Sequence, residues 1–122
     1  KQFADADEIV VAAPYWDLSF PAMLKVYVEH ITVNGIVFHY TEEGIPEGLC
    51  GAKRLIYVMT AGGPGSSYNY GYDYFKGLAQ MFGIHDTYCV SADMLDVVGM
   101  DAHKILTDAC DRARKLSEEL HQ

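Results

Sequence analysis

The chain has 122 residues, half of them hydrophobic, and its 17 acidic against 9 basic side chains give a formal net charge of −8. This length suits one domain with a real core, which excludes a disordered chain, and the negative charge repels phosphate backbones, which excludes a nucleic-acid partner. No apolar run approaches the roughly 20 residues that span a bilayer, so we expect no membrane partner either.

The first residues, KQFADADEIVV, look like the tail of a helix that runs straight into a strand. We therefore expect the chain to be part of a longer protein. Three short apolar runs follow, at residues 9–13, 55–59 and, more weakly, 87–94. Runs that are β-branched and bounded by turn residues suit strands of a parallel sheet that is buried on both faces.

Amphipathic segments separate these runs and predict helices. The first begins near Pro21, a favourable residue for a first turn, and carries an apolar stripe at helical spacing, made by Leu24, Tyr27, Val28 and Ile31. A second stripe spans residues 75–82 and ends at Gly83, a good C-cap residue. The last helix spans residues 101–120, and its apolar face is predicted to hold Ala102, Leu106, Ala109, Ala113, Leu116 and Leu120.

Residues 33–53, between the first helix and the second strand, are too many for a plain connection and carry turn signals at Gly35, Gly44, Pro46 and Gly48. We expect a hairpin insertion at about residues 35–51, with residues 36–41 as one arm. The chain has no repeat and no low-complexity linker, so residues 1–122 are predicted to form a single domain. The order strand, helix, strand, helix, strand, helix predicts an α/β fold with a doubly wound parallel sheet.

Two of the strands end in unusual loops. The first runs into APYWDL, residues 13–18, and the second into TAGGPG, residues 60–65. Pro14 keeps the residue before it extended, so the amides that follow can point outward instead of starting a helix at once. Glycines let a backbone approach a flat ligand closely. Because ligands bind beyond the carboxyl ends of parallel strands, we expect both loops to flank one crevice.

The stretch APYWDLSFPAMLK, followed by GIVFHYTEEGIPEGLCGAKRLIYVMTAGG, resembles the FMN-dependent NADH azoreductases and the related flavodoxin-like NAD(P)H quinone oxidoreductases. Their corresponding motifs read A-P-M-Y-N-F, F-R-Y-T-E-x-G-P-x-G-L and S-R-G-G, and the resemblance runs from about Ala6 to the end. It implies a flavodoxin-like sheet of strand order 2-1-3-4-5, of which only strands three to five are represented. We expect the first strands, and the loop that holds the FMN phosphate, upstream of Lys1.

The resemblance also implies which residues bind ligands. By position, two loops would contact the flavin ring of FMN through Pro14, Tyr15, Trp16, Asp17, Leu18, Thr60, Ala61, Gly62 and Gly63. Phe38 and Tyr40 would wall the substrate pocket, which in these homodimers is built partly by the second subunit. No side chain is expected to be a strong catalytic acid, because water or Tyr40 would supply protons.

The sequence departs from the family's pattern at two of these positions. Asp17 stands where many relatives have Asn, and an ionised carboxylate can accept a hydrogen bond from the flavin N3–H but can donate none. Ala61 stands in place of the usual Arg, which removes a positive charge from the rim of the pocket. We therefore expect a shifted substrate preference.

The activity that the resemblance implies is the transfer of two electrons from NADH or NADPH, through FMN, to a quinone, an azo compound or a similar flat small-molecule acceptor. Two alternatives stay open. One is a flavodoxin-type carrier that passes electrons to protein partners, and the other is a non-catalytic truncated domain without its flavin loop. The insertion at residues 35–51 suits a dimer pocket and therefore speaks against the carrier.

The remaining polar residues predict no further site. The 3 cysteines are odd in number and lack CxxC spacing, which predicts reduced thiols, and the 5 histidines are too dispersed for a metal site. Asp93 and Asp96 follow the third strand, where a turn role is favoured over a catalytic one. Nothing at the N-terminus resembles a signal peptide, so we expect a cytoplasmic protein.

Overall fold

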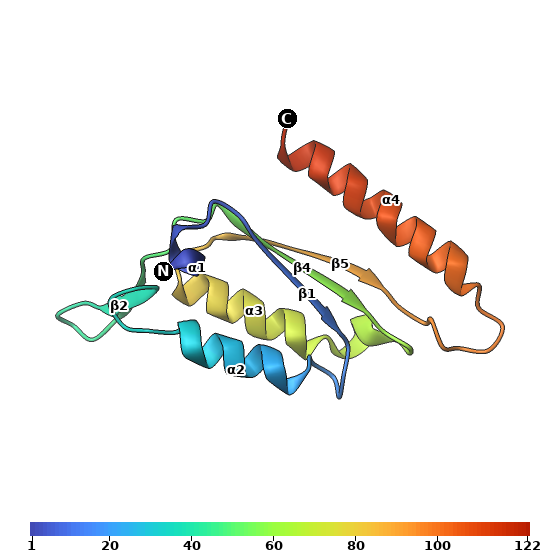
Figure 1. Ribbon diagram of the computed structural model, residues 1–122, viewed down its shortest axis with the longest axis horizontal. Helices are drawn as coiled ribbons and strands as arrows, with labels where there is room; N and C mark the ends of the chain where they lie inside the picture. The colour runs from blue at the N-terminus through green and yellow to red at the C-terminus, as the bar shows by residue number, and fades with distance from the viewer.

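The computed structural model describes residues 1–122. It contains a three-stranded sheet, a separate two-stranded hairpin and helices on both sides of the sheet (Figure 1). In chain order the elements are α1 (Gln2–Asp5), β1 (Ile9–Pro14), α2 (Ala22–Ile31), β2 (Phe38–Tyr40), β3 (Pro46–Gly48), β4 (Arg54–Thr60), the 3-10 helix η1 (Gly65–Tyr68), α3 (Tyr70–Met81), β5 (Asp86–Ala92) and α4 (Ala102–Leu120). No helix is long and apolar enough to cross a lipid bilayer.

The sheet has the strand order β1-β4-β5, and neighbouring strands run parallel. The three predicted apolar runs are these strands, so the predicted parallel α/β arrangement is confirmed. In the register of the sheet, Pro14 pairs with Thr60 and Thr60 with Ala92. The carboxyl ends of all three strands therefore meet along one edge, at the right of Figure 1.

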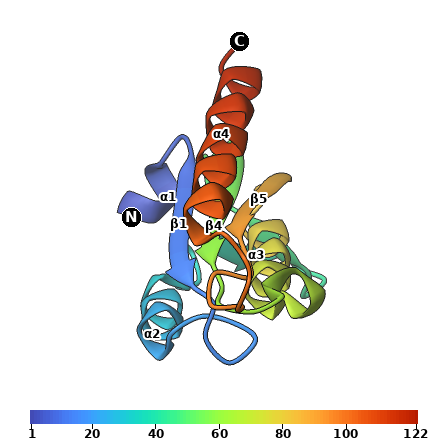
Figure 2. The same ribbon diagram turned by 90° about the vertical axis from the view of Figure 1, so that its right-hand side faces the viewer.

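Helices α2 and α3 lie on one face of the sheet and α4 lies on the other (Figures 1 and 2). The main core forms on the α3 side, where Leu55 and Tyr57 of β4 are each 1% exposed and Phe75 of α3 is 2% exposed. The rings of Tyr57 and Phe75 lie 5.5 Å apart, and Phe20 packs on Phe75 at 5.4 Å. Burial raises the pKa of Tyr57 to about 12, so its hydroxyl stays protonated.

Strand β1 differs from the prediction of strands buried on both faces. Ile9, Val11 and Ala13 are buried, but the residues between them are exposed, and Val10 keeps 60% of its surface. The physical reason lies in α4, the only helix on that side of the sheet. Its buried residue Ala109 faces the groove over β4 and β5, which leaves the same face of β1 uncovered in this chain.

The predicted helix ends are present. Gly83, with φ of +82°, follows α3, and the side chain of Asp101 accepts the Lys104 amide at 3.1 Å and so caps α4. The predicted apolar stripes are less buried than expected, because Tyr27 of α2 is 50% exposed and Leu106 of α4 is 42% exposed. Helices α2 and α4 have a single buried residue each, so the sheet covers only part of their stripes.

Strands β2 and β3 form an antiparallel hairpin in which Phe38 pairs with Gly48. The hairpin docks on the C-terminal end of α3. Gly48 lies so close to the backbone of Phe82 that a Cβ at Gly48 would overlap it, and the Cys50 amide donates to the Phe82 carbonyl at 3.1 Å. The hairpin therefore lies near the amino ends of the strands, at the far end of the sheet from the carboxyl edge (Figure 1).

Candidate functional site

The loop after β1 forms a tight turn at the carboxyl edge. The Ser19 amide donates to the Trp16 carbonyl at 3.0 Å, and the Trp16 amide donates to the Ser19 carbonyl at 3.3 Å. Asp17 and Leu18, between them, have φ of 50° and 70°. Positive φ at both central positions is the pattern of a type I′ turn, which Asp tolerates and Leu rarely adopts. Backbone strain of this kind concentrates at functional sites.

The loop after β4 makes close contacts inside the chain. A Cβ built at Gly62 would overlap the carboxylate of Asp96 and lie 3.0 Å from its Cγ. A Cβ at Gly65 would lie 2.8 Å from the Cβ of Ala61. Neighbouring protein atoms therefore crowd both glycines, and the approach of a ligand to this loop stays a prediction. Gly63 is different, because a Cβ there would meet nothing within 4 Å.

The loop after β5 is joined to the loop after β4. The amides of Met94, Leu95 and Asp96 donate to carbonyls of residues 61–63 at 3.0, 3.1 and 3.0 Å, and Met94 has a φ of 66°. One carboxylate oxygen of Asp93 accepts a hydrogen bond from the amide of Ser66 in η1 at 2.8 Å, while the other is buried without a partner. The turn role favoured for both aspartates therefore suits Asp93, whose carboxylate joins two loops, whereas Asp96 takes part only through its backbone amide.

The loop after β1 is in turn tied to the start of α3. The Tyr15 hydroxyl donates to the Tyr68 carbonyl at 3.1 Å, and the Tyr70 amide donates to the Leu18 carbonyl at 3.1 Å. Tyr15 therefore holds its loop from one side, and the strained Leu18 is held through its carbonyl. All three strand-end loops form one connected unit at the carboxyl edge.

A cavity of about 300 Å³ opens at this edge, which faces the viewer in Figure 2. Residues of all three loops and of the adjoining strand ends line it: Pro14, Tyr15, Trp16, Thr60, Ala61, Gly62, Leu95 and Asp96. The indole of Trp16 is 59% exposed beside the opening. Small-molecule sites span about 300 to 1,000 Å³, so the cavity suits one part of a cofactor-sized ligand.

Comparison with known proteins agrees with this geometry. A family described as having a flavodoxin-like fold matches residues 1–116. The chain belongs to this family. Among its relatives, the FMN-dependent NADH:quinone oxidoreductase of Clostridium beijerinckii is 44% identical over 96% of the chain, and FMN-dependent NADH:quinone oxidoreductase 2 of Clostridium acetobutylicum is 42% identical over 97%. The chain spans 61% of the length of the C. acetobutylicum relative and 60% of the other.

Solved structures of the flavodoxin-like family are also similar. An azoreductase from Bacillus anthracis str. Sterne has a TM-score of 0.82 and 28% identity, with 97% of this chain and 59% of that chain covered. An FMN-dependent NADH-azoreductase from Bacillus anthracis str. Ames Ancestor, in complex with FMN, has a TM-score of 0.85 and 26% identity, with 99% and 59% covered. The family resemblance that the motifs carry is thus confirmed.

The residues at this flavodoxin-like edge fit the flat ring of a flavin. The N–H groups of Asp17, Leu18, Gly62 and Gly63 make no hydrogen bond within the chain. An isoalloxazine ring presents carbonyl oxygens and ring nitrogens as acceptors along one edge, so unpaired backbone donors suit it. No Lys or Arg lines the cavity, so these residues fit the ring rather than the phosphate.

The predicted ring contacts fall in two groups. Most of them line the cavity itself, while Asp17, Leu18 and Gly63 lie in the same loops without lining it. Ala61 meets the cavity but is only 3% exposed, since its methyl group lies against Gly65. Asp96 lines the cavity although the sequence favoured only a turn role for it. Its position just after a strand was the only feature of the sequence that pointed to this site. The backbone hydrogen bonds that bring the loop after β5 over β4 leave no pattern in the neighbouring residues.

The predicted substrate residues are not brought to this cavity within one chain. Phe38 is 7% exposed and packs in the core, while Tyr40 is 54% exposed, and their rings meet edge to face at 5.3 Å. Both belong to the hairpin at the opposite end of the sheet (Figure 1). Their role as a pocket wall stays a prediction that requires a second subunit.

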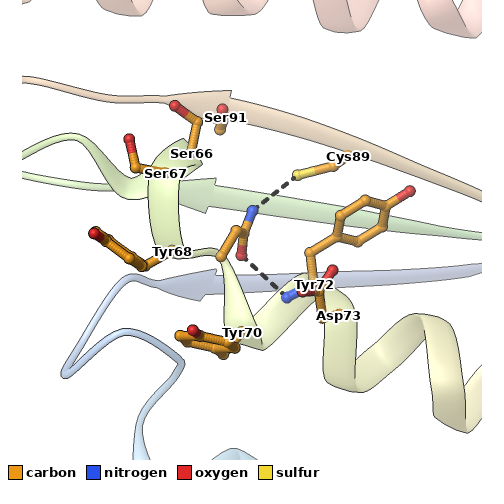
Figure 3. Close-up of a pocket in the computed structure, with 9 residues that line it drawn as sticks. Ser66, Ser67, Tyr68, Tyr70, Tyr72, Asp73, Cys89 and Ser91 are labelled. Atoms are coloured by element: carbon orange, nitrogen blue, oxygen red, sulfur yellow. Dashed lines mark hydrogen bonds between the residues drawn. The ribbon is translucent and has the colours of Figure 1, made fainter.

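A second pocket, of about 470 Å³, lies beside β5 and the start of α3 (Figure 3). It is lined by Ser66, Ser67, Tyr68, Asn69, Tyr70, Tyr72, Asp73, Cys89 and Ser91. The Asn69 side chain accepts the Tyr72 amide at 3.1 Å and donates to the Cys89 sulfur at 3.7 Å. Burial raises the pKa of the Cys89 thiol, so it is no activated nucleophile. The side chain of Asn69 in this pocket therefore caps the start of α3.

Proposed function

We propose that this chain supplies the flavin-ring side of an FMN-dependent oxidoreductase, which moves two electrons from NADH or NADPH to a quinone, an azo compound or a similar flat acceptor. One observation carries the proposal: the loops at residues 13–18 and 60–65, singled out by sequence, meet at one cavity beside unpaired backbone donors. The relatives of the chain, FMN-dependent NADH:quinone oxidoreductases, support it.

The overall reaction would convert NADH, a proton and a quinone into NAD⁺ and a quinol. Bound FMN would supply a ring that takes up the hydride equivalent and delivers the two electrons to the acceptor. The amides of Gly62 and Gly63 would donate to acceptor atoms on the ring edge and stabilise negative charge there. The exposed Trp16 indole beside the cavity would cover the ring and exclude water.

We further propose a homodimer as the working form. The outer side of α2 and the hairpin region expose large apolar side chains, namely Met23, Val26, Tyr27, Val33, Ile36, Tyr40, Ile45 and Leu49. Exposed apolar surface of this extent is typical of protein interfaces. A second copy docked there would let Tyr40 approach a cavity that its own chain holds at the far end of the sheet, and its hydroxyl would then deliver a proton to the acceptor.

We place the protein in the cytoplasm as part of the same proposal. NADH and NADPH are produced and used inside cells, and Cys50, Cys89 and Cys110 are all free thiols. Free thiols are usual in reducing compartments.

The test uses the 122-residue chain and a longer version in which the N-terminal region of the C. beijerinckii relative precedes Lys1. Each is incubated with FMN, passed through a gel-filtration column and assayed for NADH consumption with an uncharged quinone. Flavin that co-elutes with protein and turns over faster than the same amount of free FMN is the expected result for at least one form. Flavin retention without faster turnover would favour an electron carrier, and retention by neither form would refute the proposal.

A further inference from the structure

The charge in the lining of the cavity is of one sign, negative. Asp96 is the only acidic residue of its lining, and no Lys, Arg or His lines it. The Asp96 carboxylate has no hydrogen-bond or ion-pair partner in the chain. It therefore presents an uncompensated negative charge to whatever enters.

The position of this charge is held by the backbone. The Asp96 amide donates to the Gly62 carbonyl at 3.0 Å, and the Leu95 amide donates to the Ala61 carbonyl at 3.1 Å. The carboxylate itself lies against the Cα of Gly62, a position open only because that residue lacks a side chain. The charge thus stands beside the amides proposed to face the flavin ring.

A second unpaired carboxylate belongs to a loop that lines the cavity. Asp17 follows the lining residue Trp16, is exposed, and takes part in no ion pair. It belongs to the loop after β1, whereas Asp96 belongs to the loop after β5, with β4 between them. Asp93 is different, because its carboxylate is engaged by the Ser66 amide. The loops after β1 and β5 therefore each carry one carboxylate without an ion-pair partner.

Few cations are free to offset these charges: Lys53, Arg112 and Lys115 have no acidic partner, and Arg112 donates to the Ser91 carbonyl of β5. Most basic side chains are paired with acids of their own helix or of the sheet's other end, as Arg54 is with Glu8 at 2.6 Å. The whole chain has a net charge of −8. A cleft lined by one sign of charge and by apolar walls repels ligands of the same sign more strongly than an open surface does.

We propose that Asp96, assisted by Asp17, makes this site select uncharged and cationic flat acceptors against anionic ones such as sulfonated quinones and sulfonated azo dyes. The inference rests on the proposed function and adds the substrate class to it. It concerns electrostatic exclusion of the acceptor at the entrance, and an effect of either charge on the ring itself is common to all acceptors and cancels in a ratio between two of them. One like charge at such a rim changes kcat/KM by about threefold to tenfold at low salt.

The test compares an uncharged naphthoquinone with its monosulfonate, using the form of the protein that reduces the uncharged quinone. Asp96→Asn, Asp17→Asn and the double variant are made, with Glu118→Gln as a control that removes the same charge near the end of α4, away from the carboxyl edge. The measured quantity is the ratio of kcat/KM for the sulfonate to kcat/KM for the uncharged quinone. Differences in reactivity between the two acceptors cancel when variants are compared with the parent.

We expect the ratio to rise about threefold to tenfold in Asp96→Asn, to rise further in the double variant and to stay unchanged in Glu118→Gln. Added salt should remove the differences between the variants. If the parent reduces the uncharged quinone but the ratio is the same in all variants, this inference alone is overturned. A parent that does not reduce the uncharged quinone overturns the proposed function, and this inference with it.

Discussion

Replacing Gly62 by Ala tests the geometry of the carboxyl edge most directly. The new Cβ would overlap the Asp96 carboxylate, lie 3.0 Å from its Cγ and 3.3 Å from its Cβ, all closer than ordinary contacts. Asp96 is exposed, so its side chain can rotate away at about 0.5–1.5 kcal/mol. The backbone hydrogen bonds between the two loops then survive, and we expect the free energy of unfolding to fall by about 1 kcal/mol.

For a chain of this size, a loss of about 1 kcal/mol lowers the melting temperature by about 3–5 °C. In the form that retains FMN, the methyl group of Gly62→Ala would also stand beside an amide proposed to face the ring. We expect the Kd for FMN to rise about tenfold, which equals about 1.4 kcal/mol. Thermal unfolding followed by circular dichroism and an FMN titration followed by fluorescence give the two values.

Two further variants make the reasoning refutable. Asp96→Ala removes the two atoms that the new Cβ would approach most closely, so Gly62→Ala should cost less in that background, with a coupling of about 0.5–1 kcal/mol. Gly77→Ala, at an exposed helix position where a Cβ meets nothing within 4 Å, should stabilise the protein slightly. Additive effects of Gly62→Ala and Asp96→Ala would refute the placement of these loops.

Gly48→Ala should lower the free energy of unfolding, measured by urea titration, by about 3 kcal/mol. The new Cβ would overlap backbone atoms at the end of α3, and these cannot move aside. A loss under 1 kcal/mol would contradict the docking of the hairpin. Tyr40→Ala should change the KM and kcat for the acceptor more than FMN retention, and lost flavin with normal turnover of the remainder would speak against its proposed role. Hydrogen bonds from His121 at 3.1 Å and Arg54 at 2.6 Å hold the pKa of Glu8 below its ordinary value of 4.5. The stability that this ionised carboxylate adds is complete above about pH 4.5 and is lost as the pH falls through the lower pKa of the folded state. Glu8→Gln should therefore weaken the dependence of the urea midpoint on pH at acid pH. An unchanged dependence would exclude a contribution of Glu8.

The sequence by itself determined the local elements and the two motif loops. The apolar runs became β1, β4 and β5, and the positions of Gly83 and Asp101 marked where α3 ends and α4 begins. These features depend on neighbours in the chain, on side-chain period, on capping and on backbone freedom, so they can be inferred from local patterns. The loops after β1 and β4 could be assigned to one edge because parallel strands place their carboxyl ends together.

Only the tertiary structure decided which distant groups share the cavity and which surfaces stay open. Asp96 reaches the edge because backbone bonds draw the loop after β5 over β4, and Tyr40 lies far from it because the hairpin docks at the end of α3. One face of β1 is exposed because α4 packs over its neighbours. Such outcomes depend on contacts between segments far apart in the chain, whose register and packing no local pattern of residues encodes.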